Sequence, residues 1–190
     1  MNDIHSHLTV CAAEAARVAR GVTAEQLGRP SVCADWTVRE LVNHLVLYSS
    51  HGLERRALRE QLPEATVQRD FTADADWAEG YAAQLDRALA AWEKPEVWEG
   101  DVDTGHMTMP ATVIASLIVK ELTLHGWDLA RSTGERFTVP DATGTFVLAV
   151  VEEHAELYRR YEGFAAPVPV PENATDFERA LATSGRDPRA

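Results

Sequence analysis

The chain has 190 residues, of which 45% are hydrophobic and 25% charged, so it suits one globular domain of ordinary composition. Its formal net charge of −12 disfavours nucleic acid and anionic membrane surfaces, whose phosphates would be repelled. No apolar run reaches the ~18–20 residues of a membrane span, and the N-terminal segment lacks the pattern of a secretory signal. Two cysteines are too few for a disulfide scaffold. Together these observations predict a cytoplasmic protein.

Apolar residues recur at helical spacing along most of the chain, and no segment shows the alternation of a convincing β-strand. The helices that this spacing predicts are, in chain order, 4–20, 37–62, 74–94, 109–133, 139–160 and 175–183. Gly21, Pro63, Pro95 and Gly134 follow the first four helices as stop signals. The fold class is therefore all-α, and four main helices with short connections indicate a four-helix bundle.

The connections divide the chain into a bundle and an extension. We expect the bundle over residues 1–134, and over residues 135–190 a C-terminal helix and an extended tail packed on the bundle. Residues 63–72 form a polar, irregular connection between the second and third helices. Residues 96–107 are too few and too polar for another long helix, so a turn or a short extended excursion is expected there.

The helix over 109–133 carries the most informative polar residues. Its apolar side chains gather on one broad face, with Glu121 in the middle of that face and His125 one turn further on. A carboxylate in a core-facing stripe is costly unless a positive charge compensates it. Either a bound metal ion or an arginine from another helix is therefore expected beside Glu121. Asp128 lies in the same sector, either as a partner of His125 or paired with an arginine.

A third ligand is available from the second helix. His44 lies at the edge of its core face, where it either joins Glu121 and His125 or bonds a backbone carbonyl. Two histidines and a carboxylate are a common ligand set for a divalent metal, with the remaining positions open. His51 lies roughly 10 Å further along by helix rise, too far to share the metal. Trp36 and Trp127 are expected to be packing residues. Surface or loop positions are expected for the other histidines: His5, His7, His106 and His154.

Three segments carry a family resemblance: PSVCADWTVRELVNHLV, ELTLHGWDLARSTGE and FAAPVPVPENATDFERALATSGRDP. In this order they resemble the mycothiol-dependent maleylpyruvate isomerase family of the DinB-like superfamily, over most of the chain. In that family the His of N-H-L and the Glu and His of E-x-x-x-H bind the metal, which implies His44, Glu121 and His125 here. The resemblance also implies a DinB-like bundle with up-down-down-up helices. It implies zinc, or another divalent ion such as nickel, with mycothiol as co-substrate.

The resemblance implies a metal-dependent enzyme that activates a low-molecular-weight thiol for transfer to, or isomerisation of, a small electrophile. The thiol is expected to come from outside, because Cys33 belongs to a loop and Cys11 to a core stripe. The founding isomerase has a further C-terminal domain that contributes an arginine for the substrate, and this chain resembles a short member without it. Catalytic residues and the oligomeric state are not assigned. The alternatives are a non-catalytic metal-bound bundle that binds a ligand or partner protein, and a purely structural metal site.

Overall fold

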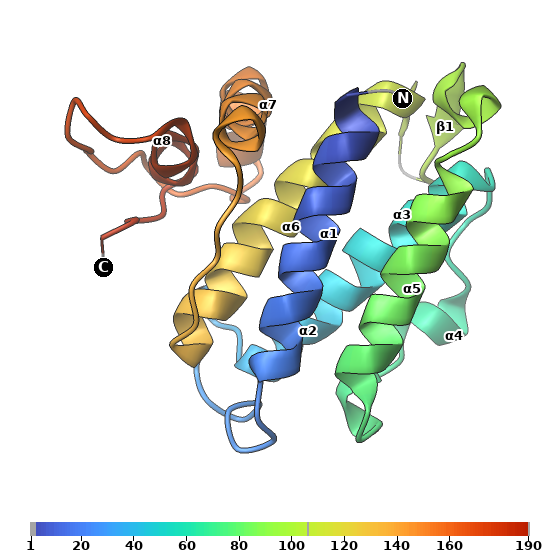
Figure 1. Cartoon of the computed structure of the whole chain (residues 1–190), viewed down its shortest axis with the longest axis horizontal. Helices are drawn as coiled ribbons and strands as arrows, with labels where there is room; N and C mark the ends of the chain where they lie inside the picture. Colours follow the sequence, from blue (N-terminus) through green and yellow to red (C-terminus); the bar gives the residue numbers. More distant parts are fainter. Residues whose placement is uncertain (1–2, 106, 190) are drawn as a thin grey trace. The chain divides into compact units, whose positions relative to one another are not determined.

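The computed structural model describes residues 3–105 and 107–189, and helices dominate it (Figure 1). The α-helices are α1 (Asp3–Gly21), α2 (Val38–Val46), α3 (Gly52–Ala57), α4 (Glu64–Val67), α5 (Trp77–Ala91), α6 (Ala111–Thr133), α7 (Asp141–Arg160) and α8 (Asp176–Thr183). A π-helical turn, η1 (Leu47–His51), joins α2 to α3, and 3-10 turns lie at η2 (Phe71–Ala73) and η3 (Pro95–Trp98). Strands β1 (Asp101–Asp103) and β2 (Thr108–Pro110) form a short antiparallel hairpin. The predicted all-α class is confirmed, and the hairpin is the short excursion expected before α6.

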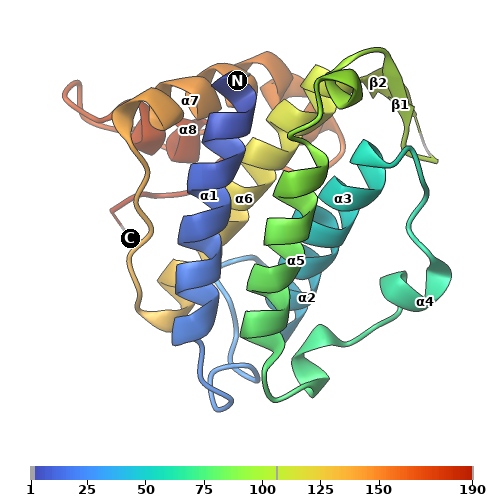
Figure 2. The same cartoon turned by 45° about the vertical axis from the view of Figure 1, so that its right-hand side comes forward.

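The chain divides into two compact units, Met1–Phe137 and Thr138–Ala190. In the first unit, α1 packs against α5 and α6, α6 packs against α2, and α3 packs against α5. Figures 1 and 2 show that α1 and α6 run in one direction while α2–α3 and α5 run in the other. This is the predicted up-down-down-up bundle. Among the described residues, no helix is both long enough and apolar enough to cross a bilayer.

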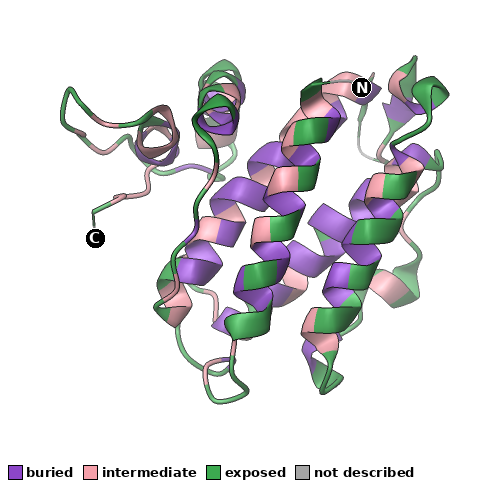
Figure 3. Ribbon diagram, viewed as in Figure 1, coloured by how far each residue is buried: buried purple, intermediate pink, exposed green. Residues whose placement is uncertain are grey.

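The predicted apolar faces form the core of the bundle (Figure 3). Fully buried side chains come from each main helix and include Leu8, Cys11 and Val18 of α1, Leu41 and Leu45 of α2, Leu85 of α5, and Leu122 and Leu129 of α6. The predicted caps are also present. The Thr37 side chain accepts from the Glu40 amide while the Glu40 carboxylate accepts from the Thr37 amide, and Gly134 ends α6 with a left-handed φ of 80°.

The second helix differs from its prediction. The π-turn interrupts it after Val46, and it ends at Ala57, earlier than expected. Arg59 takes a left-handed φ of 57°, and its guanidinium donates to the backbone carbonyls of Val97 and Glu99 at 3.0 and 2.7 Å. These bonds reach a segment that is distant in the sequence, so the local pattern contained no sign of this helix end. The third helix is also shorter than predicted.

One histidine expected at the surface is buried. His5 is 7% exposed, and its Nε2 lies 3.2 Å from the backbone oxygen of Leu89. The prediction was wrong because His5 precedes Leu8 by three residues and therefore shares its core-facing side of α1. His7 and His154 are half-buried, and His106 lies outside the described residues.

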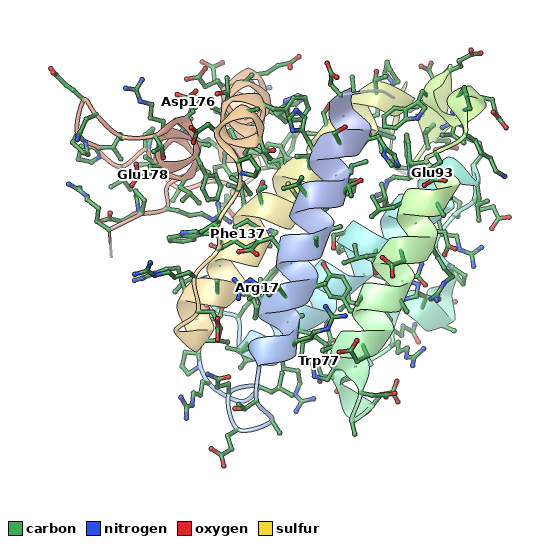
Figure 4. The ribbon with its side chains drawn as sticks, in the orientation of Figure 1. Arg17, Trp77, Glu93, Phe137, Asp176 and Glu178 are labelled. Atoms are coloured by element: carbon green, nitrogen blue, oxygen red, sulfur yellow. The ribbon has the colours of Figure 1, made fainter. Side chains whose placement is uncertain are left out.

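In the second unit, α7 packs against α8. The α8 N-terminus is a capping box, in which the Thr175 side chain accepts from the Glu178 amide and the Glu178 carboxylate accepts from the Thr175 amide. Figure 4 labels Glu178 and Asp176 of this helix. The Thr145 hydroxyl of α7 donates to the Asp176 carboxylate at 2.6 Å, which joins the two helices. The residue bounds of both helices are within two residues of the predicted ones.

Gly126 lies next to His125 on α6, and its Cα faces the ring of Phe137. Figure 4 labels Phe137. A Cβ on Gly126 would lie 2.4 Å from a ring carbon of Phe137. Gly126→Ala is therefore expected to lower the free energy of unfolding in urea by about 1–3 kcal/mol, the usual cost of overpacking. Gly80→Ala on α5 is the control, because no atom lies within 4 Å of the position that its Cβ would take and alanine favours a helix by about 1 kcal/mol. Equal effects of the two changes would contradict the packing argument.

Candidate metal centre

The structure brings together all three residues that were predicted to bind a metal. His44 comes from α2, and Glu121 and His125 come from α6. The Nε2 atoms of His44 and His125 lie 2.9 and 3.4 Å from the same Glu121 oxygen, Oε1. The three donor atoms lie within 4.8 Å of one another. His44 therefore faces Glu121, and metal binding by the group stays a prediction.

Two local features hold His44 in position. The capping box at Thr37 fixes the start of α2, and His44 follows about two turns later. The neighbouring Asn43 side chain donates to Asp70 at 2.9 Å and accepts from the Phe71 amide at 2.8 Å. Hydrogen bonds from Asn43 and then from Thr72 hold the pKa of Asp70 below its ordinary value. The Asn of the N-H-L motif thus ties the end of the connection between α3 and α5 to the helix that carries His44.

A lysine that was not expected at the site compensates Glu121. The Lys120 ammonium lies 3.0 Å from Glu121 Oε2, and the Lys120 side chain is 3% exposed. Burial raises the pKa of Glu121, but Lys120, His125 and His44 together outweigh burial and hold this pKa well below its ordinary value. The carboxylate therefore stays ionised and presents Oε1 to both histidines. The sequence pattern had suggested an arginine from another helix, and the presence of a rare lysine in an apolar run was the available signal.

The other nitrogen of His125 faces a buried carboxylate. His125 Nδ1 lies 3.0 Å from Asp128 Oδ2, and Asp128 is 1% exposed. An acceptor at Nδ1 fixes the ring orientation and the tautomer, so that Nε2 points toward Glu121. Of the two partners considered for Asp128, the structure places His125 beside it. Cys33 Sγ donates to the same Asp128 oxygen at 3.2 Å and lies 4.0 Å from His125 Nδ1.

Two aromatic rings flank His44. The Trp36 and Tyr48 rings both lie 4.8 Å from the His44 ring between centroids, and Trp36 also lies 6.1 Å from the His125 ring. The loop over 31–36 that carries Trp36 is joined to α6 by a 3.0 Å bond from its backbone to the Ser132 hydroxyl. Trp36 thus packs as predicted, but it packs against the site. Tyr48 is 38% exposed, so this side of His44 borders solvent.

The three donors fit a divalent cation. Zinc–nitrogen and zinc–oxygen bonds of about 2.0–2.1 Å in a tetrahedron place ligand atoms about 3.3 Å apart. The observed separations of 2.9 and 3.4 Å from Glu121 Oε1 are close to this spacing. Two imidazoles and one carboxylate are also a donor set found in catalytic zinc sites. Cys33 and Asp128 form a second possible ligand group with His125, but they lie at its Nδ1 and not at the Nε2 that faces Glu121.

Asp128→Asn is expected to lower metal affinity about 10- to 100-fold, because an amide is a weaker acceptor for the ring N–H that orients His125. The measurement is a competition titration with a chelator of known affinity. Asp86→Asn, at an exposed position of α5, is the control and should leave the affinity unchanged. An unchanged affinity in Asp128→Asn would mean that Asp128 does not orient the ligand.

Two solved structures resemble the fold of this chain, and two further proteins resemble its sequence. Two crystal structures of mycothiol-dependent maleylpyruvate isomerase, one of them a histidine-to-alanine mutant, match with TM-scores of 0.56 and 0.60. They are 17% and 16% identical to this chain, and the matches cover 78% of this chain and 68% of theirs. At this identity the likeness shows the fold. Two uncharacterized proteins of Mycobacterium tuberculosis are 28% identical over 142 residues, which is 71% of this chain and 69% of each relative.

The family assignment comes from the sequence of the bundle. The sequence model of the family described as "Mycothiol maleylpyruvate isomerase N-terminal domain" matches residues 8–130. This range covers more than half of the chain and includes His44, Glu121 and His125. The chain therefore belongs to the mycothiol maleylpyruvate isomerase N-terminal domain family.

Proposed function

We propose that the chain is a metal-dependent enzyme that activates a low-molecular-weight thiol, mycothiol, for transfer to or isomerisation of a small electrophile. The observation that carries this proposal is the convergence of three donors that are also accessible. The side chains of His44, Glu121 and His125 are 22%, 17% and 18% exposed. A structural zinc ion is normally enclosed by four protein ligands. Three partly exposed donors instead support a position that an outside ligand can take.

The thiol is proposed to come from outside because neither cysteine is placed to serve. Cys11 is buried, and burial raises the pKa of its thiol. The Cys33 thiol donates to Asp128 and lies on the Nδ1 side of His125, away from Glu121. When bound, a divalent cation lowers the pKa of a coordinated thiol, so that a nucleophile forms at neutral pH without a separate base.

The surroundings favour a thiol over a water molecule as the nucleophile. Metal-assisted hydrolysis commonly uses a carboxylate beside the metal as general base, as in H-E-x-x-H enzymes. Glu121 is itself a proposed ligand, and Lys120 already occupies its second oxygen. Asp128 is 1% exposed and accepts hydrogen bonds from His125 and Cys33. Among the described residues of α6, neither carboxylate is therefore free to take a proton from water.

The test follows electrophile consumption by the metal-loaded full chain. The panel contains epoxides, α,β-unsaturated acids and amides, each with and without mycothiol. Turnover should require the thiol and should vanish in His44→Ala. Thiol-independent hydrolysis that is lost in Asp128→Asn would identify a metallohydrolase instead. Binding of metal and thiol without turnover of any electrophile would favour the non-catalytic alternative.

A further inference from the structure

An arginine of α3 lies folded back over a glycine. Arg56 is half-buried, and a Cβ on Gly52 would lie 2.3 Å from Arg56 Nη1. Helical side chains lean toward the N-terminus, so the Arg56 side chain covers the position one turn earlier. Gly52 has an ordinary helical φ of −59°, so its backbone does not require glycine. The missing side chain at residue 52 is what leaves room for the guanidinium.

Arg56 belongs to the same helical run as His44. His44, Tyr48, Gly52 and Arg56 follow one another at four-residue intervals along α2, the π-turn and α3. In an unbroken α-helix, the 12 residues from His44 to Arg56 would rotate the two side chains about 120° apart. The wider π-turn advances less per residue and reduces this rotation. Burial lowers the pKa of Arg56, and the nearby Glu121 and Tyr48 oppose that shift.

The charges leave this cation available. The Lys120 ammonium pairs with Glu121 Oε2. The Arg56 guanidinium makes no hydrogen bond or ion pair to any residue that the structure describes. Two carboxylates, Glu121 and Asp128, balance the two cations, so a bound divalent ion would leave the centre with two positive charges in excess. A thiolate would neutralise one of them, and a second anion would neutralise the other.

We propose that Arg56 binds a carboxylate of the electrophile, so that the enzyme selects small anionic electrophiles over neutral ones of the same shape. This inference rests on the proposed function. A guanidinium suits the role because its planar fork donates two parallel hydrogen bonds to a carboxylate. Gly52 is the positioning residue, since it lets the guanidinium lie back along the helix, in the direction of Tyr48 and His44.

The test measures binding alone, so it does not depend on thiol chemistry. Crotonate and its neutral counterpart crotonamide are titrated calorimetrically into the metal-loaded full chain without thiol. Arg56→Met should weaken crotonate binding about 10- to 100-fold, the range for hydrogen bonds to charged groups. Crotonamide affinity and metal content should stay unchanged. Arg55→Met is the matched control, because Arg55 pairs with Glu60.

A second variant separates position from charge. Gly52→Ala keeps Arg56 but places a methyl group where its guanidinium lies, and it should weaken crotonate binding to a similar degree. The same Cβ would lie 3.3 Å from the backbone oxygen of Leu47, so helical circular dichroism is measured to show that the variant stays folded. If Arg56→Met does not fold, Gly52→Ala alone tests whether the guanidinium binds crotonate. Equal crotonate affinity in wild type and Gly52→Ala, or no crotonate binding by wild type, would overturn the proposal. Neither result would touch the metal site or the thiol requirement, which the turnover experiment tests separately.

Discussion

His44→Ala is expected to reduce bound metal from near one ion per chain to less than about a tenth. The substitution removes one of three proposed ligands, and loss of a residue that only orients a ligand already costs about 10- to 100-fold in affinity. The remaining pair, Glu121 and His125, lie on one helix and offer two donors. The measurement is elemental analysis of protein purified without chelator and without a nickel column.

The control is another histidine of the same helical run. His51 stacks on Phe71 with 5.1 Å between ring centroids and belongs to neither potential ligand group of the described residues. His51→Ala should keep its metal. Both variants should keep their helical circular dichroism, because the core consists of apolar faces and not of metal bonds. Full occupancy in His44→Ala would contradict the assignment, and unfolding on metal removal would indicate a structural site.

Glu121→Gln is expected to lower the free energy of unfolding of the metal-free protein by on the order of 3 kcal/mol at pH 7. The change leaves the Lys120 ammonium, which is 3% exposed, without its carboxylate at 3.0 Å. The pKa of Glu121 in the folded state lies below its ordinary value of 4.5. The stabilisation by the carboxylate is therefore complete above pH 4.5 and is lost as the pH falls through the folded-state pKa.

The difference in free energy of unfolding between wild type and Glu121→Gln should accordingly be largest near neutral pH and should decrease in acid. Urea denaturation in chelator at about pH 7 and below about pH 4 measures it. The double variant Lys120→Met with Glu121→Gln should regain stability, because it removes both members of the buried pair. Glu79→Gln breaks an exposed pair with Arg20 and should have little effect. If this difference in free energy of unfolding did not depend on pH, the stabilisation could not come from the charge of Glu121.

The sequence predicted those parts of the fold whose signals are local. The limits of α1, α6 and α7 follow from periodicity and from end residues such as Gly134. Glu121 and His125 could be paired because one helix holds both. Another helix carries His44, so its assignment as the third ligand required both its position at the edge of the core face and the family resemblance.

The remaining features depend on contacts between distant segments. The loop over 31–36 brings Cys33 to Asp128, 95 residues away, and no local pattern shows this. The early end of α3 depends on the bonds of Arg59 to the segment before β1. The π-turn has no residue signature, because its five residues are all compatible with an ordinary helix. Lys120 was visible in the sequence, but its pairing with the adjacent residue required side-chain geometry.

The π-turn at Leu47–His51 also bears on how such a protein can diversify. It separates the half of the helical run that presents His44 from the half that presents Arg56. A π-turn closes one residue later than an α-helical turn, so deleting one residue within it would restore an ordinary helix and leave the half that carries Arg56 in nearly the same rotation about the helix axis. The length of this helical run could thus change by one residue during evolution while His44 and Arg56 keep the faces on which they lie.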